Sequence, residues 1–341
     1  MLETLRSEIA RAGGWIPFSR YMELALQAYY GRGDRQFGAG GDFVTAPELG
    51  SLYARTLARQ LHALEGPILE LGAGSGALAE VLTKELDRDY LILETSPALR
   101  ERQAARLGGR VEFLDALPRK FRGTVLANEV VDALPVHVVA WREEGIMERG
   151  VSPGLTWEER PAQGTVLTEA QALPVESPYI SEIGLAGRAW MRTIADALHH
   201  GVVFVIDYGF PRREFYHPER SMGTLMCHSR HRAHANPFNN PGEEDITAHV
   251  DFSALAEAAA GAGLEVLGYA NQAQFLVNCG ITEVLEQANV ENALHYAPIA
   301  AEAQKLLSPA EMGELFKVLA VGRGMPAPLL GFSRGDRAHT L

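Results

Sequence analysis

The segment whose residue types and spacing most clearly indicate a chemical role is a short glycine-rich run, Glu70-Leu71-Gly72-Ala73-Gly74-Ser75-Gly76. It follows an apolar stretch and precedes a helical pattern. In that context glycines bring the backbone close to a ligand and leave free amides at a helix N-terminus. Glu94 ends the next predicted strand, where a carboxylate can accept hydrogen bonds from both ribose hydroxyls of an adenosine. Asp115 lies just past the third strand, where it could approach the adenine edge.

Two kinds of cofactor and one purely structural role fit this loop. Gly72-x-Gly74-x-x-Ala77 matches the looser pattern of dinucleotide dehydrogenases, and a tight strand-to-helix turn needs no ligand. Glu70, however, is unfavourable beside a pyrophosphate and useful near the sulfonium and amino groups of S-adenosylmethionine. Gly76 completes a GxGxG pattern. These features favour a methyltransferase with S-adenosyl-L-methionine as cofactor over the two alternatives.

Short apolar runs alternate with helical patterns along the chain, as parallel strands with crossover helices require. The runs predict strands at Pro67–Leu71, Tyr90–Glu94, Arg110–Phe113, Thr124–Ala127, Val202–Ile206, Leu264–Tyr269 and Lys317–Val321. Helices are expected at about 2–30, from Thr45 to about Leu64, and at Ala77–Leu86, Ala98–Leu107, Tyr179–Leu198 and Phe252–Ala260. Thr45, Pro47 and Glu48 suit a capped helix start, and Gly38–Phe43 is expected to be a loop. The result is a doubly wound α/β fold.

Several segments resemble one family, the MidA family, over about residues 5–325. They are Gly41–Glu48, Leu69–Gly76, Asn128–Pro135, Asp207–Gly209, Asp245–Phe252 and Gln272–Leu276. The mitochondrial members of this family are protein arginine methyltransferases that act in respiratory complex I assembly. The resemblance therefore implies S-adenosylmethionine as methyl donor and a protein substrate, with a complex I subunit as one candidate.

The resemblance also implies an architecture. The expected fold class is α/β, with a seven-stranded Rossmann-like methyltransferase sheet, an N-terminal helical extension and an inserted α-rich substrate lobe. Residues 1–65 would form the extension and contribute to the cofactor site. Residues 66–325 would form the methyltransferase domain, with insertions at about 136–175, 210–250 and 281–313. Residues 326–341 would be a tail, which we expect to fray.

By segment match, the resemblance assigns cofactor binding to residues on the N-terminal helix cap and at four strand ends. These are Thr45, Pro47, Glu48, Glu70, Gly72, Gly74, Gly76, Glu94, Asp115 and Asn128. Asp207 and Tyr208 follow the strand Val202–Ile206 and are placed to shape the pocket of the methyl acceptor. A capping carboxylate and a packed tyrosine are the structural alternatives for this pair.

Glu129 and Asp132 are the predicted catalytic residues. A guanidinium is a poor nucleophile because its pKa exceeds about 12. Paired carboxylates can hold it bidentately, localise its charge and accept the released proton. Glu129 and Asp132 stand three apart after strand Thr124–Ala127, so a turn could face both to one site. The alternatives are a cofactor contact for Glu129 and a helix N-cap for Asp132.

Three functions stay open from the sequence. The first is a protein arginine N-methyltransferase that transfers the methyl group in line. The second is a small-molecule methyltransferase. The third is a non-catalytic protein that binds the cofactor and assembles a respiratory complex.

Cys227-His228-Ser229-Arg230-His231-Arg232-Ala233-His234 is the cluster that most invites a metal-site interpretation. Its spacing matches no zinc pattern and its arginines would repel a cation, so we predict no metal. The same segment contributes to the one basic cluster of the chain, with Arg212, Arg213 and Arg220.

The composition narrows the partners and the compartment. The chain has 341 residues and a net charge of −12, and no basic stripe is visible, so we expect no nucleic-acid partner. We also expect no membrane partner, since no apolar run approaches the roughly 20 residues of a membrane span. Two distant cysteines and the lack of a signal-peptide pattern predict a cytoplasmic protein. The oligomeric state is left open, with a homodimer as one option.

Overall fold

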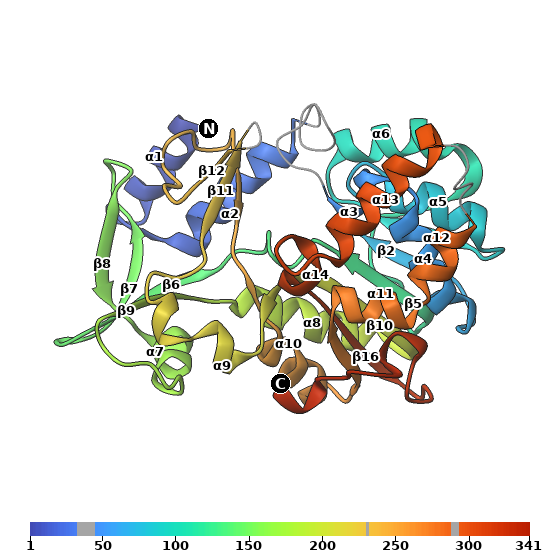
Figure 1. Ribbon diagram of the computed structural model, residues 1–341. Helices are drawn as coiled ribbons and strands as arrows, with labels where there is room; N and C mark the ends of the chain where they lie inside the picture. Colours follow the sequence, from blue (N-terminus) through green and yellow to red (C-terminus); the bar gives the residue numbers. More distant parts are fainter. Residues whose placement is uncertain (33–44, 230–231, 288–292) are drawn as a thin grey trace.

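The chain folds into a large α/β unit and a smaller lobe beside it, as the computed structural model shows (Figure 1). The structure describes residues 1–32, 45–229, 232–287 and 293–341. The predicted loop Gly38–Phe43 and Arg230 lie outside these ranges. No helix in the described ranges is long and apolar enough to cross a membrane.

The large unit is built on one mixed sheet, whose main path runs β15-β16-β10-β5-β2-β3-β4. The strands are β2 (Ile68–Leu71), β3 (Tyr90–Leu93), β4 (Glu112–Leu114), β5 (Phe121–Asn128), β10 (Leu198–Phe210), β15 (Glu265–Asn271) and β16 (Phe316–Arg323). β16 runs antiparallel to both neighbours, and β2, β3, β4, β5 and β10 are parallel. The seven predicted strands are confirmed, and the short β14 (Val250–Asp251) adds to the end of β10.

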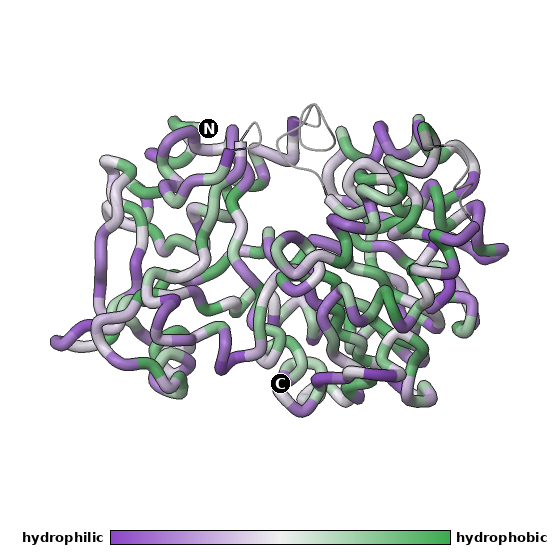
Figure 2. The backbone as a smooth tube through the Cα atoms, in the orientation of Figure 1, coloured by the Kyte–Doolittle hydropathy of each residue, from purple (hydrophilic) through white to green (hydrophobic). Residues whose placement is uncertain are grey.

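Helices cover both faces of this sheet. On one face lie α4 (Leu52–His62), α5 (Ala77–Glu85), α6 (Pro97–Leu107), α11 (Gln272–Asn278), α12 (Ile281–Glu286) and α13 (Ala293–Leu307). On the other face lie α8 (Leu185–Ala197) and α10 (Phe252–Gly261). The central strand β10 buries Phe204 toward the first set and Val203 and Val205 toward the second. Because β10 is buried on both faces, its sequence is a continuous apolar run. Figure 2 shows such apolar segments in the interior.

The inserted lobe is not α-rich, so that part of the expected architecture is wrong. It contains a sheet of β1 (Ile16–Pro17), β7 (Gly145–Val151), β6 (His137–Arg142) and β9 (Tyr179–Ile183), with β8 (Trp157–Pro161) beside β7. A second sheet has the order β12 (Arg232–His234), β11 (Met226–Ser229) and β13 (Asp245–Thr247). The inserted segments give the lobe only the short helices α7 (Gly164–Gln171) and α9 (Arg212–Phe215). β6 is covered on both sides, which removes the polar alternation that would have identified it.

The predicted helix Tyr179–Leu198 is also wrong in its first part. Residues up to Ile183 form β9, and the helix α8 begins only at Leu185. β9 buries all its side chains, including the carboxylate of Glu182. That carboxylate accepts hydrogen bonds from the backbone N–H groups of Thr224 and Leu225 and from the Thr224 hydroxyl. The Glu182 carboxylate is thus buried in the lobe and satisfied by a segment that is distant in the sequence.

The N-terminal helices belong to the smaller lobe rather than to the sheet of the large unit. The expected helix 2–30 is split into α1 (Leu2–Arg11) and α2 (Phe18–Tyr30), because Gly13 and Gly14 adopt φ values of 76° and 88°. Tyr21 and Leu26 of α2 lie in the core of this lobe. The helix expected from Thr45 to Leu64 is likewise split into α3 (Ala46–Leu49) and α4. The break is at Gly50, where a Cβ would approach the Glu302 carboxylate within 2.1 Å.

The C-terminal tail does not fray, contrary to expectation. The 3-10 turns Leu330–Phe332 and Ala338–Thr340 pack beside β15. Phe332 is 2% exposed and its ring lies 5.3 Å from that of Phe275. The Arg337 amide donates to the Tyr269 carbonyl at 2.7 Å. The tail therefore covers the edge region of the main sheet, which limits pairing with other chains.

Replacing Phe332 with Ala tests this role of the tail. We expect Phe332→Ala to lower the free energy of unfolding by about 3–5 kcal/mol, because a buried ring is lost and a cavity remains. Chemical denaturation measures the change, and Ser333→Ala at the neighbouring exposed position is the matched control. Equal stability of the two variants would show that the tail does not contribute to the core.

Candidate active site

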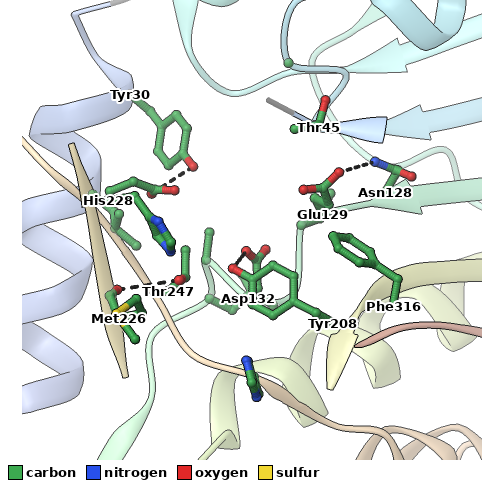
Figure 3. Close-up of a pocket in the computed structure, with 18 of the residues that line it drawn as sticks. Tyr30, Thr45, Asn128, Glu129, Asp132, Tyr208, Met226, His228, Thr247 and Phe316 are labelled. Atoms are coloured by element: carbon green, nitrogen blue, oxygen red, sulfur yellow. Dashed lines mark hydrogen bonds between the residues drawn. The ribbon is translucent and has the colours of Figure 1, made fainter. Parts of the chain in front are cut away.

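A cavity of about 960 Å³ lies between the carboxyl ends of the main-sheet strands and the smaller lobe. Open α/β sheets bind ligands at this edge. The large unit contributes the glycine loop and the segments that follow β3 and β5. The smaller lobe contributes one side of α2 and residues of β11 and β13. Figure 3 shows side chains from both units facing this common space.

The glycine loop turns the chain from β2 into α5 with left-handed backbone at Gly72, Gly74 and Gly76, with φ values of 63°, 54° and 79°. A side chain is strained in this region, so glycine is required there. A Cβ at Gly72 would also press on Val130 at 3.2 Å. The loop therefore exposes backbone, rather than side chains, to the cavity.

Two buried carboxylates flank the loop and are oriented by neighbours. Glu70 Oε2 accepts a hydrogen bond from the Tyr90 hydroxyl at 2.7 Å, and burial raises the pKa of Glu70 to about 7. Glu94 Oε1 accepts from the Ser96 amide at 2.8 Å, and its Oε2 accepts from Gln103 Nε2 at 3.0 Å. Both carboxylates line the cavity.

These residues fit S-adenosylmethionine. Among the described residues, no lysine, arginine or histidine forms an ion pair with Glu70, so a sulfonium or ammonium group would neutralise a charge that the protein leaves unpaired. Glu94 follows β3 at the cavity and has free lone pairs, so its carboxylate can accept hydrogen bonds from a ribose diol. The glycine backbone leaves room between the two for an adenosine.

The segment before α4 closes the cavity over the glycine loop. Thr45 is at the N-cap position of α3, but its side chain makes no capping hydrogen bond. Glu48 instead accepts a hydrogen bond from the Ser75 hydroxyl of the loop. Arg106 of α6 donates to Ser75 and lies 3.8 Å from Glu48, so it fixes both segments. Thr45, Pro47 and Glu48 all line the cavity, which places part of the N-terminal region at the site.

The turn after β5 carries the two predicted catalytic carboxylates into the cavity (Figure 3). Asn128 donates to Glu129 Oε1 at 3.2 Å and accepts from the Tyr53 hydroxyl at 2.6 Å. Glu129 has a φ of 54°, which is strained for a residue with a side chain. Burial raises the pKa of Glu129 to about 8 and that of Asp132 to about 6. Strain and buried charge concentrated in one turn are typical of a functional site.

Asp207 and Tyr208 support this turn from the end of β10. Asp207 is fully buried and accepts hydrogen bonds from the amides of Val131 and Asp132 at 2.9 Å and 3.2 Å. Burial and the neighbouring carboxylates raise the pKa of Asp207 well above its ordinary range. The Tyr208 hydroxyl donates to Asp132 Oδ2, and its ring packs edge-on to Phe316 at 5.4 Å.

The structure brings most of the predicted site residues together, but not all. Gly76, Asp115 and Asp207 do not line the cavity. The Asp115 side chain is 89% exposed and its carboxylate accepts from Arg100 at 2.5 Å. Asp207 lies beneath the wall, behind Asp132. Gly76 lies at the N-cap of α5, where a Cβ would face Leu107.

Several residues that line the cavity were not predicted. On the lobe side they include Tyr30, His228, Asp245, Thr247 and His249. The Tyr30 hydroxyl donates to Asp245 at 3.0 Å and thereby joins α2 to β13. Burial lowers the pKa of His249 to about 4, so this ring is neutral at pH 7. The segment Asp245–Phe252 belonged to the family resemblance, and that was the available signal. Tyr30 had no local signal, because a long stretch of chain separates it from its partner.

The sheet order, the glycine loop and the acidic residue after β3 together define the class of enzymes that use S-adenosylmethionine. Residues 52–270 match the family model described as "Putative S-adenosyl-L-methionine-dependent methyltransferase". A crystal structure of a Burkholderia thailandensis protein bound to S-adenosyl-homocysteine is 47% identical, with a TM-score of 0.94 over 100% of this chain and 96% of that chain. The chain therefore belongs to this S-adenosyl-L-methionine-dependent methyltransferase family, and it is an enzyme of that class with S-adenosylmethionine as its cofactor.

Curated relatives extend the similarity to eukaryotes. "Protein arginine methyltransferase NDUFAF7 homolog, mitochondrial" of Drosophila melanogaster is 28% identical over 98% of this chain and 88% of its own length. "Protein arginine methyltransferase NDUFAF7, mitochondrial" of Homo sapiens is 26% identical over 94% and 83%. These relatives confirm the resemblance to the MidA family. Both relatives are named mitochondrial, which contradicts our expectation of a cytoplasmic protein. That expectation rested on composition, and composition does not separate a cytoplasmic chain from a mitochondrial one.

Mutation distinguishes the roles of Glu94 and Asp115, the two acidic residues predicted to bind adenosine. We expect Glu94→Ala to weaken binding of S-adenosyl-homocysteine by about tenfold or more, because a charge-assisted hydrogen bond is worth roughly 1.5–3 kcal/mol. Isothermal titration calorimetry measures the affinity. Asp115→Asn is the matched control and should bind as the wild type does, since its carboxylate faces solvent and Arg100. Equal weakening by both variants would contradict this assignment.

Proposed function

We propose that this methyltransferase acts on arginine in a protein, with Glu129 and Asp132 holding the guanidinium. The names of the curated relatives support the arginine acceptor. The geometry supports the two carboxylates, since both line the cavity and Val130 of the same turn lies beside Gly72 of the glycine loop. The remaining predicted residues keep their proposed roles: cofactor binding for the glycine loop, Glu94, Asn128 and the segment 45–48, and shaping of the acceptor pocket for Tyr208.

The observation that carries this proposal is a pair of carboxyl groups in the cavity wall that no cation of the described residues neutralises. Asp132 is 6% exposed, and its Oδ1 has no hydrogen-bond partner among the described residues. In the same part of the chain, neither Glu129 nor Asp132 forms an ion pair. Burying a carboxylate is unfavourable unless a cation or hydrogen bonds compensate it. A bound guanidinium supplies both, because it is positively charged and presents five donors.

The chemistry required of the protein is positioning and proton acceptance. S-adenosylmethionine, when bound, supplies an electrophilic methyl group. Glu129 and Asp132 can orient the guanidinium by charge-assisted hydrogen bonds, so that one nitrogen faces the cofactor side of the cavity. A carboxylate can then accept the proton that the methylated nitrogen releases. Asp207 acts indirectly, because it accepts hydrogen bonds from the Val131 and Asp132 amides and so holds the turn in place.

The walls of the acceptor half fit an extended side chain. Tyr208 and Phe316 provide aromatic surface next to Asp132, and Tyr30 approaches from α2 on the opposite side (Figure 3). An aromatic face attracts a guanidinium through its quadrupole. For the protein substrate we propose a respiratory complex I subunit, on the family resemblance.

Conservative replacement of the two carboxylates tests the proposal. We expect Glu129→Gln and Asp132→Asn each to lower kcat/KM for an arginine peptide by about 100-fold or more, the scale of general acid–base catalysis. Transfer of labelled methyl groups, followed by mass spectrometry of the peptide, measures the rate and the modified residue.

Two controls separate chemistry from cofactor binding and folding. Both variants should bind S-adenosyl-homocysteine with near-wild-type affinity, and a peptide with lysine in place of arginine should not be methylated. Asp115→Asn should keep full activity, because its side chain is exposed. Near-wild-type rates in both carboxylate variants would refute the assignment.

The raised pKa values predict opposite effects of pH on activity and stability. The guanidinium needs carboxylates, so kcat/KM should rise as Asp132 and Glu129 lose protons near pH 6 and 8.

Folding raises the pKa of Glu129 above its unfolded value of about 4.3. The protonated form is therefore favoured in the folded protein, and stability is lost as pH rises toward 8. Glu129→Gln should raise Tm by about 2 °C or more at pH 8.5 and have little effect at pH 4. Thermal unfolding at both pH values measures this difference, and an equal shift at both would contradict it.

A further inference from the structure

The three-stranded sheet of the smaller lobe has two faces with different surroundings. On one face Met226, His228 and Thr247 line the active-site cavity (Figure 3). Neighbouring residues of a strand point to opposite sides, so Cys227 points away from the cavity. Cys227 is fully buried in the core that includes Tyr21 of α2, and β11 and β12 lie beside α2 in Figure 1.

A cysteine, a histidine and a glutamate meet on this second face. Cys227 is paired with His234 across β11 and β12, and Glu244 directly precedes β13. The sulfur of Cys227, a ring nitrogen of His234 and a carboxylate oxygen of Glu244 lie within 4.8 Å of one another. Backbone hydrogen bonds of the sheet hold all three strands, so the positions of these groups are set by the register. We propose that Cys227, His234 and Glu244 bind a zinc ion.

The Glu244 carboxylate provides an independent sign of a missing partner. Glu244 is 5% exposed, and its Oε2 has no hydrogen-bond partner among the described residues. Oε2 is nevertheless 3.0 Å from Nε2 of His234. The two atoms are therefore close without the alignment of an N–H···O bond, as expected when both point toward a third atom. Zinc bonds of about 2.0–2.3 Å place tetrahedral ligand atoms roughly 3.3–3.8 Å apart, so these two atoms need to separate by only a few tenths of an ångström to bind the same ion.

The other carboxylate oxygen is held by a neighbour. Asn240 Nδ2 donates to Glu244 Oε1 at 2.6 Å. Contacts of this kind orient metal ligands and leave one oxygen free to bind. The Asn236 amide donates to His234 Nδ1 at 3.3 Å. Binding through Nε2 puts the ring proton of His234 on Nδ1, so the Asn236 amide has to turn away from the ring when the metal binds.

The charges balance for a divalent ion. A thiolate and a carboxylate contribute two negative charges and imidazole contributes none, so Zn²⁺ makes the buried site neutral. Zinc is also the metal that a mixed sulfur, nitrogen and oxygen set selects. The His234 side chain is 30% exposed, which gives a water molecule access to a fourth position. Arg232, one of the two arginines that argued against a metal, is exposed, so solvent screens its charge.

The proposed ion would stabilise the wall of the acceptor pocket rather than take part in methyl transfer. The sheet has only short strands, of four, three and three residues, and small elements commonly need a metal or a disulfide for stability. Cross-linking its three strands from behind would fix Met226, His228 and Thr247 on the cavity side.

Metal analysis of the full chain tests the proposal. After removal of metal with a chelator, titration with Zn²⁺ should give one tightly bound ion per chain. Co²⁺ should give a thiolate-to-cobalt charge-transfer band in the absorption spectrum. Cys227→Ser should abolish that band, and Glu244→Gln should weaken Zn²⁺ binding by about tenfold or more. Zn²⁺ should also raise the Tm of the wild type but not that of Cys227→Ser.

Cys279→Ala is the matched control, because Cys279 is the other buried thiol and lies in the core of the large unit. It should retain the cobalt band and the bound zinc. The wild-type spectrum decides the question even if a variant fails to fold. Absence of a thiolate band in the wild type, or zinc binding that survives both Cys227→Ser and Glu244→Gln, would overturn the proposal.

Discussion

The geometry of the site depends on the buried carboxylate of Asp207. It accepts hydrogen bonds from the amides of Val131 and Asp132 and so fixes the turn that follows β5. That turn includes Glu129 in a strained conformation with a φ of 54°. Strain of this kind persists only where the surroundings determine it. Asp207 lies 76 residues after Val131 in the sequence but is adjacent to it in space, because β5 and β10 are parallel neighbours.

The second determinant is the way that the smaller lobe closes over the sheet. The lobe is assembled from three separate parts of the chain, namely the N-terminal helices, residues 136–183 and residues 211–251. The hydrogen bond from Tyr30 to Asp245 joins the first of these parts to the third at the edge of the cavity. The acceptor half of the site therefore forms only when these parts have packed together. The cofactor half needs fewer long-range contacts, because β2, β3 and the turns after them are close in sequence.

The site also shows the cost that binding a cation imposes on an unliganded protein. The pKa values of Glu70, Glu129, Asp132 and Asp207 are all raised, and burial is the largest cause for each. A fold selected only for stability would place neutral groups at such positions. Three of these acids, Glu70, Glu129 and Asp132, line the cavity, where the proposed function places a sulfonium and a guanidinium.

Local sequence patterns predicted the strands of the main sheet and the glycine loop that faces the cavity. All seven strands of the main path were predicted, because each is a short apolar run bounded by turns and separated from the next by a helical pattern. Glu70, Gly72, Gly74 and Glu94 could be placed because strand ends and glycine turns leave local signals. The β-structure of the smaller lobe could not be predicted, since β6 and β9 are buried on both faces and lack alternation. The packing of distant segments leaves Asp115 in solvent and sets Asp207 behind the turn instead of in the pocket wall. It also brings the Tyr30 hydroxyl to Asp245. Each of these depends on which distant segment packs beside the residue, which no local pattern encodes.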